Sequence, residues 1–177
     1  MPDRDAGPEV RIVHLTLEAF EALAEGDLAA ANAVSPVPLT DAFTDPHWRQ
    51  TWSRRASQVR TDPSTALWVT GVIWDTNRRI AVGRAGFHAP PDDSGMVEIG
   101  YAVDPDHRRR GYARAALEAL LSRAAQDPDV KTVRASIRPD NQPSYNLVSR
   151  YGFTRTGEQW DDEDGLEFIY EVAAGNL

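Results

Sequence analysis

The chain has 177 residues, which suits one α/β domain, and its 41% hydrophobic and 26% charged residues exclude global disorder. It has no cysteine, which excludes disulfides, thiolate catalysis and Cys-ligated metals. The N-terminus has no apolar signal region and no segment is apolar enough to span a membrane, so we expect a soluble, cytoplasmic protein. The net charge of −8 disfavours nucleic acid and either favours a cationic substrate or only maintains solubility.

The hydrophobic pattern predicts a flexible N-terminal tail, residues 1–9, followed by one domain, residues 10–177. Along the chain, apolar residues recur at the 3.6-residue spacing of helices in some segments and at the two-residue spacing of strands in others. Gly, Pro and Asp separate these segments. In chain order we expect a strand over 10–15, helices over 17–25, 27–33 and 45–61, strands over 66–74, 79–88 and 96–103, a helix over 112–126, a strand over 130–137, a helix over 143–151, and strands over 153–160 and 166–172.

Three polar residues are placed to begin the first helices. Thr16 and Asp27 are predicted N-caps, and Asp45-Pro46 places Asp at an N-cap and Pro at the first helical position. Trp48 and Trp52 then lie one turn apart. They either line an acceptor pocket or belong to the core, and the pattern favours the core.

The segment between strand 96–103 and helix 112–126 is basic. The first turn of a helix has unpaired N–H groups and the positive end of the helix dipole, so it is a natural anion site. Gly111 and the small Ala113 let a phosphate approach the main chain. Four arginines, Arg108, Arg109, Arg110 and Arg114, add attraction and bidentate contacts. These features favour a pyrophosphate ligand.

Two motifs resemble those of the GNAT superfamily of N-acetyltransferases. Arg108-x-x-Gly111-x-Ala113 resembles the family's pyrophosphate motif. One helix and one strand later, Asn141-x-x-Ser144, followed by Val148, Arg150 and Gly152-Phe153, resembles its second motif. The resemblance implies an α/β (α+β) fold with a mixed, mostly antiparallel seven-stranded sheet, about four flanking helices, and splayed central parallel strands over 96–103 and 130–137. It implies acetyl-CoA as the acyl donor, with no metal. The implied coenzyme contacts are Tyr101, Ala102, Val103, Arg108, Arg109, Arg110, Gly111, Tyr112, Ala113, Arg114, Asn141 and Ser144.

In this family an amine attacks the thioester directly, so a base or a water chain must take the amine proton. Glu98 is the candidate base, because it shares a strand face with the small residues Gly100 and Ala102, which leaves room for a ligand. The alternative is an edge glutamate that faces solvent or pairs with an arginine such as Arg84. The family's donor to the thioester oxygen is backbone N–H, which maps here to residues 101–103.

The leaving thiolate needs a proton or a hydrogen bond. Many family members have a tyrosine seven residues after the motif asparagine, where this chain has Val148. Ser144, one turn earlier, and Tyr151, three residues later, lie on the same predicted helix face and are the candidates. For Tyr151 we favour the alternative of a core position under the helix.

Three functions fit the sequence. The first is an N-acetyltransferase acting on the primary amine of a small molecule, with a cationic acceptor as one form. The second is a protein N-terminal acetyltransferase of the ribosomal-protein type, a branch that Glu98-Ile99-Gly100-Tyr101 resembles. The third is a non-catalytic acyl-CoA-binding module, which Val148 keeps open. We expect no nucleic-acid or membrane partner, and exposed edge strands favour a homodimer.

Overall fold

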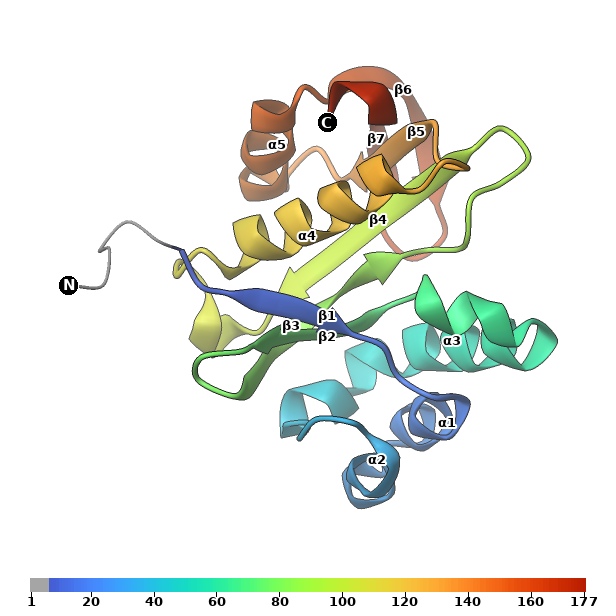
Figure 1. The fold of residues 1–177 in the computed structure, drawn as a ribbon, viewed down its shortest axis with the longest axis vertical. Helices are drawn as coiled ribbons and strands as arrows, with labels where there is room; N and C mark the ends of the chain where they lie inside the picture. The colour runs from blue at the N-terminus through green and yellow to red at the C-terminus, as the bar shows by residue number, and fades with distance from the viewer. Residues whose placement is uncertain (1–6) are drawn as a thin grey trace. The chain divides into compact units, whose positions relative to one another are not determined.

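The computed structural model describes residues 7–177, so most of the predicted tail, residues 1–9, lies outside the described residues (Figure 1). Across the described chain no helix combines the length and the apolar composition that a membrane crossing needs. The strands are β1 (Val10–Val13), β2 (Gly71–Asp75), β3 (Ile80–Phe87), β4 (Met96–Val103), β5 (Thr132–Ile137), β6 (Thr154–Asp161) and β7 (Gly165–Ala173). The α-helices are α1 (Leu17–Glu25), α2 (Leu28–Val34), α3 (Arg49–Thr61), α4 (Tyr112–Gln126) and α5 (Gln142–Val148).

The strands form a seven-stranded sheet in the order β1-β2-β3-β4-β5-β7-β6. The β1–β2, β2–β3, β5–β7 and β6–β7 pairs are antiparallel, and β4–β5 is parallel. The parallel pairing joins Met96–Glu98 to Thr132–Arg134, and both strands continue beyond it. The predicted mixed, mostly antiparallel sheet with a central parallel pair is confirmed, with five α-helices where about four were expected.

The chain divides into two compact units, each with its own elements. The first runs to Gly86 and includes Tyr101–Ala119, so it holds β1, β2, most of β3, the end of β4 and the start of α4. In this unit α1, α2 and α3 gather on one side of the strands (Figure 1). The second comprises Phe87–Gly100 and Leu120–Leu177, with the start of β4, strands β5 to β7, the end of α4 and helix α5.

Capping side chains begin the helices where the sequence predicts. Thr16 accepts a hydrogen bond from the Ala19 N–H, and Asp27 accepts one from the Ala30 N–H. Gly26 separates the two helices in a left-handed conformation (φ 77°) that other residues rarely adopt. Asp45 also caps as predicted, but the three residues after it form a 3₁₀ turn, and α3 begins at Arg49.

The strand predicted over 66–74 is wrong at its start. Pro63–Leu67 forms a 3₁₀ turn, and β2 begins only at Gly71. The Asp62 carboxylate accepts hydrogen bonds from the N–H and the hydroxyl of Ser64, and Pro63 occupies the first turn. A cap and a proline therefore hold a local turn, although the apolar residues after Ala66 have a strand-like pattern.

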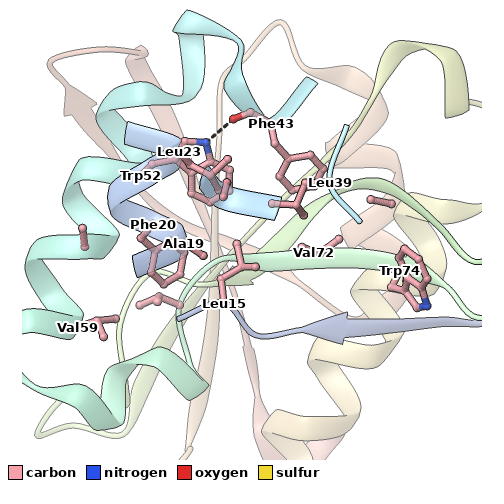
Figure 2. Close-up of a cluster of buried hydrophobic side chains, with 14 residues drawn as sticks. Leu15, Ala19, Phe20, Leu23, Leu39, Phe43, Trp52, Val59, Val72 and Trp74 are labelled. Carbon is pink, nitrogen blue, oxygen red and sulfur yellow. Dashed lines mark hydrogen bonds between the residues drawn. The ribbon is translucent and has the colours of Figure 1, made fainter. Parts of the chain in front are cut away.

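The core of the first unit is built around Trp52, which is fully buried (Figure 2). Its ring stacks on Phe20 and Phe43, with ring centroids 6.0 Å and 6.1 Å apart. The indole N–H donates a 2.8 Å hydrogen bond to the Phe43 carbonyl, drawn as a dashed line in Figure 2. Trp52 is thus a core residue, as the spacing favoured, while Trp48 is only half-buried.

We expect Trp52→Ala to lower the free energy of unfolding by about 3–5 kcal/mol, because it opens a cavity and leaves the Phe43 carbonyl without its donor. Urea denaturation followed by circular dichroism measures the change. Trp160→Ala is the matched control, since Trp160 is 75% exposed and its loss should change stability by less than about 0.5 kcal/mol. Equal effects of the two substitutions would contradict the assignment of Trp52 to the core.

Candidate functional site

The loop between β4 and α4 has an unusual backbone. Pro105–His107 forms a 3₁₀ turn and Arg108 is extended. Arg109 (φ 58°) and Gly111 (φ 85°) are both left-handed, directly before α4 begins at Tyr112. A left-handed non-glycine residue costs about 1 kcal/mol or more, so this bend is imposed by its surroundings. Left-handed residues before a helix turn successive N–H groups toward one point, which suits an anion.

Gly111 is required here for two reasons. Its positive φ disfavours any residue with a side chain. In addition, a Cβ on Gly111 would lie 3.1 Å from the Cδ atom of Pro8, so the segment before β1 lies against the loop. The sequence suggested that Gly111 gives a phosphate access to the main chain, and the contact with Pro8 is a further, structural reason for glycine.

The four predicted arginines are exposed but differ in their contacts. The Nε atom of Arg108 donates to the Val103 carbonyl at the end of β4 (3.1 Å), and Arg114 pairs with Glu118 one turn along α4 (2.9 Å). Arg109 and Arg110 show no hydrogen-bond or salt-bridge partner among residues 7–177. Two guanidinium groups at the bend are therefore available to an anionic ligand.

Tyr112 is buried and anchors the start of α4. Its hydroxyl donates a 2.6 Å hydrogen bond to the Asp75 carboxylate and accepts one from Arg78 (2.9 Å). Burial and the bond to Asp75 raise the pKa of Tyr112 above its ordinary value, so the phenol stays protonated as a donor. The Tyr112 side chain, which the sequence placed among the coenzyme contacts, is thus buried within the first unit.

A buried ion pair holds the other end of the loop. Arg84 on β3, 3% exposed, is hydrogen-bonded to Asp104, the residue after β4. Its guanidinium lies over the rings of Trp48 and Phe43, 4.3 Å and 4.9 Å from their centroids. The backbone N–H of Asp104 donates to Val82 on β3 (2.9 Å). Arg84 therefore pairs with Asp104, which removes it as the partner considered for Glu98.

Burial dominates the electrostatics of this pair. It raises the pKa of the Asp104 carboxyl, although Arg84 acts in the opposite direction, and it lowers the pKa of Arg84, which Asp104 opposes. Both ionised groups are thus penalised by the loss of water. The pair adds little net stability and instead fixes where the loop begins. Neither residue was singled out from the sequence as part of the site.

Glu98 lies on β4 in the second unit with its side chain 18% exposed. Its carboxylate is 3.7 Å from the Nδ1 atom of His88, and its carbonyl accepts a 2.8 Å hydrogen bond from the His88 N–H. Val97 and Ile99, which alternate with Glu98, are buried. The predicted alternation of β4 therefore holds here, and Glu98 occupies the less buried face together with Gly100.

The residues of the second motif lie on and after α5. Asn141 is the N-cap, because its side chain accepts from the Ser144 N–H (3.2 Å), and Ser144 is half-buried in the first turn. Val148 is fully buried at the end of α5. Tyr151 follows on a 3₁₀ turn, Ser149–Tyr151, that continues directly from the end of α5.

The predicted residues thus fall into two groups. The end of β4, residues 101–103, and the loop up to Arg114 lie in the first unit. Glu98, Asn141, Ser144 and Tyr151 lie in the second. The β4 strand is continuous across both groups, with Glu98 three residues before Tyr101.

A family profile described as an acetyltransferase (GNAT) domain matches residues 9–154, which include both motifs and the whole loop. The chain belongs to the GNAT acetyltransferase family. Membership agrees with the fold.

Individual relatives match a smaller part of this chain than the family profile does. The chain is 38% identical over 72 residues to the uncharacterized N-acetyltransferase YjdG of Bacillus subtilis, covering 41% of this chain and 43% of that protein. It is 38% identical over 66 residues to an L-2,4-diaminobutyric acid acetyltransferase of Streptomyces anulatus, covering 37% and 38%. The chain thus spans about half the length or less of these curated relatives.

Among solved structures, the GNAT chain resembles RimL, a ribosomal L7/L12 α-N-protein acetyltransferase in complex with coenzyme A. The TM-score is 0.63 at 18% identity, with 93% of this chain and 94% of RimL covered. An identity this low establishes a shared fold and nothing further.

We expect Arg84→Met to lower the free energy of unfolding by about 3–5 kcal/mol, because it leaves Asp104 buried without its partner. Adding Asp104→Asn should recover part of the loss, since the uncompensated charge is then removed. Urea denaturation of both variants measures this. Arg60→Met is the control: Arg60 pairs with Glu21 on the surface, where loss of an ion pair costs about 0–1 kcal/mol. An Arg84→Met variant as stable as Arg60→Met would disprove the anchoring role.

Proposed function

We propose that this GNAT protein transfers an acetyl group from acetyl-CoA to the primary amine of a small molecule by direct attack of the amine on the thioester. The observation that carries the proposal is the pair of left-handed residues, Arg109 and Gly111, immediately before the 15-residue helix α4. This backbone fits a pyrophosphate, because N–H groups of the bend and of the first helical turn can donate to its oxygens. Family membership supports acetyl as the group that is transferred.

The proposed coenzyme contacts follow from this placement. Backbone groups from Arg109 to Ala113 bind the pyrophosphate, with the four arginine side chains, Arg108, Arg109, Arg110 and Arg114, adding positive charge. The backbone of residues 101–103, at the end of β4, would hold the pantetheine arm and donate to the thioester oxygen. Asn141 and Ser144 are proposed contacts near the sulfur, where Ser144 or Tyr151 would donate a proton or a hydrogen bond to the leaving thiolate. The coenzyme supplies the activated acetyl group, and the chain supplies position and proton transfer.

For the acceptor, we propose a small amine. The resemblance to a diaminobutyric acid acetyltransferase supports an acceptor with a free amino group, and the net charge of −8 favours one that carries positive charge elsewhere. The second candidate is a protein N-terminus, supported by the likeness of Glu98-Ile99-Gly100-Tyr101 and of the fold to the RimL type. A panel of diamines, amino acids and short peptides with free N-termini distinguishes them by amine-dependent release of CoA thiol.

We expect the native chain to bind acetyl-CoA in the micromolar range and the double variant Arg109→Glu, Gly111→Asp to lose binding, because it places two carboxylates at the anion site and a side chain at a left-handed position. Isothermal titration calorimetry measures both. The control is Arg49→Glu, Gly175→Asp, which makes the same change of charge at an exposed arginine outside both motifs and at a glycine with no atom within 4 Å of its Cβ position. Native protein that does not bind acetyl-CoA would refute the coenzyme site.

We expect Glu98→Gln to reduce kcat for the best amine by about 100- to 10,000-fold, the range for loss of a group that assists proton transfer. Acetyl-CoA affinity should change little, because the carboxylate is not among the proposed coenzyme contacts. Steady-state thiol release together with calorimetry separates the two effects. An unchanged rate and an unchanged pH–rate profile would show that Glu98 has no part in deprotonation.

A further inference from the structure

The turn between β2 and β3, residues 76–79, lies beside the loop that precedes α4. The Asp104 N–H donates to the carbonyl of Val82 (2.9 Å), which lies two residues after β3 begins at Ile80. Asp104 is itself the first residue after β4. The start of β3 and the end of β4 are therefore neighbours, and the β2–β3 turn and the loop leave the sheet at the same end (Figure 1).

The segment before β1 contacts both of these connections. The Glu9 carbonyl accepts hydrogen bonds from the N–H (3.0 Å) and the hydroxyl (3.2 Å) of Thr76 in the turn. The preceding residue, Pro8, lies against the loop, with its Cδ atom 3.1 Å from the position of a Cβ on Gly111. Two consecutive residues thus touch the turn and the loop, so these connections lie close together in the first unit.

Side chains hold the β2–β3 turn on the start of α4. One oxygen of the Asp75 carboxylate accepts from the N–H groups of Asn77 (3.0 Å) and Arg78 (2.8 Å). The other oxygen accepts from the hydroxyl of Tyr112 (2.6 Å), the first residue of α4, and Arg78 donates to that hydroxyl (2.9 Å). Because Asp75 and Tyr112 are buried, the turn has a fixed position next to the helix.

Arg79 ends the turn in a left-handed conformation (φ 58°). Among residues 7–177 it shares this conformation with one other residue that is not glycine, Arg109 in the loop. Glycine and asparagine adopt it at lower cost, so an arginine here needs another reason. Arg79 is exposed and has no hydrogen-bond or ion-pair partner within the described chain. Its guanidinium is therefore available to a ligand.

Positive groups outnumber carboxylates at this end of the first unit, although the whole chain carries −8. Five arginines lie on the turn and the loop, namely Arg78, Arg79, Arg108, Arg109 and Arg110. The carboxylates on these segments are fewer: Asp75, which is bonded to Tyr112, and the exposed Glu9 and Asp106. A ligand with two separate anionic groups fits such a surface better than a ligand with one.

We propose that Arg79 binds the 3′-phosphate of the coenzyme and so forms a second anion subsite beside the pyrophosphate. The proposal rests on the proposed function. Coenzyme A has a phosphate monoester on its ribose in addition to the pyrophosphate, and a phosphate monoester carries about −1.5 to −2 charges at pH 7. The loop and the first turn of α4 account for the pyrophosphate, which leaves the monoester for the turn. A guanidinium can donate two parallel N–H groups to it.

The test compares CoA with dephospho-CoA, which lacks only the 3′-phosphate, by isothermal titration calorimetry. We expect the native chain to bind CoA at least about tenfold more tightly, the value of one charge-assisted contact. In Arg79→Asn this preference should fall to about twofold or less because CoA binds more weakly, while the affinity for dephospho-CoA stays within about twofold of native. Arg49→Asn, which removes an exposed guanidinium from α3, should keep the native preference.

Two comparisons separate a direct contact from a general effect. Arg110→Asn removes the same charge from the loop and should weaken both ligands by a similar factor, because both contain the pyrophosphate. Asparagine tolerates the left-handed conformation, so Arg79→Asn should raise the Tm, and its weaker CoA binding would then not come from unfolding.

The outcomes distinguish this inference from the proposed function. A native chain that binds neither ligand refutes the coenzyme site and the subsite with it. A native chain that binds both ligands equally refutes the subsite alone. An Arg79→Asn variant that keeps the native preference for CoA also refutes it. So does an Arg110→Asn variant that loses the preference to the same extent as Arg79→Asn, since the 3′-phosphate then responds to the overall charge and not to one contact.

Discussion

The structure of the loop between β4 and α4 depends on one constraint: the chain must leave β4 and enter α4 through a sharp left-handed bend. The left-handed residues Arg109 and Gly111 make this bend, and left-handed arginine is unfavourable by itself. Polar anchors at both ends offset that cost. Asp104 is held by Arg84 before the bend, and Tyr112 is held by Asp75 after it. A ligand that binds the bend therefore meets a conformation already formed, which lowers the entropy lost on binding.

Phe43 connects this loop to the hydrophobic core. Its carbonyl accepts from Trp52 and its ring stacks on the same indole, while the other contact of the ring is the guanidinium of Arg84. A buried arginine needs a fixed position to keep its hydrogen bond, and two aromatic rings, those of Phe43 and Trp48, define that position. Direct contacts thus run from Trp52 through Phe43 and Arg84 to Asp104.

Much of the fold was predictable because its signals are local. The predicted bounds of β4 and α4 match the structure, since each has a long regular period that Asp-Pro ends. The strand over 66–74 failed where a cap at Asp62 outweighed the apolar pattern. The pairing of Arg84 with Asp104 could not be predicted. The sequence pattern shows which residues share a face of a strand, but not which side-chain conformation brings two distant residues into contact. The motif of the loop could be identified from the sequence, whereas the Arg84–Asp104 and Tyr112–Asp75 interactions that hold the loop are evident only in the structure.

The same distinction applies to proton transfer. Alternation placed Glu98 on the more open face of β4 and made it the candidate base, but only the structure shows the imidazole of His88 beside it, with Nδ1 3.7 Å from the carboxylate. Gly100 makes the arrangement possible by its missing side chain. A glycine that the sequence interpreted as space for a ligand is thus space for the ring of His88.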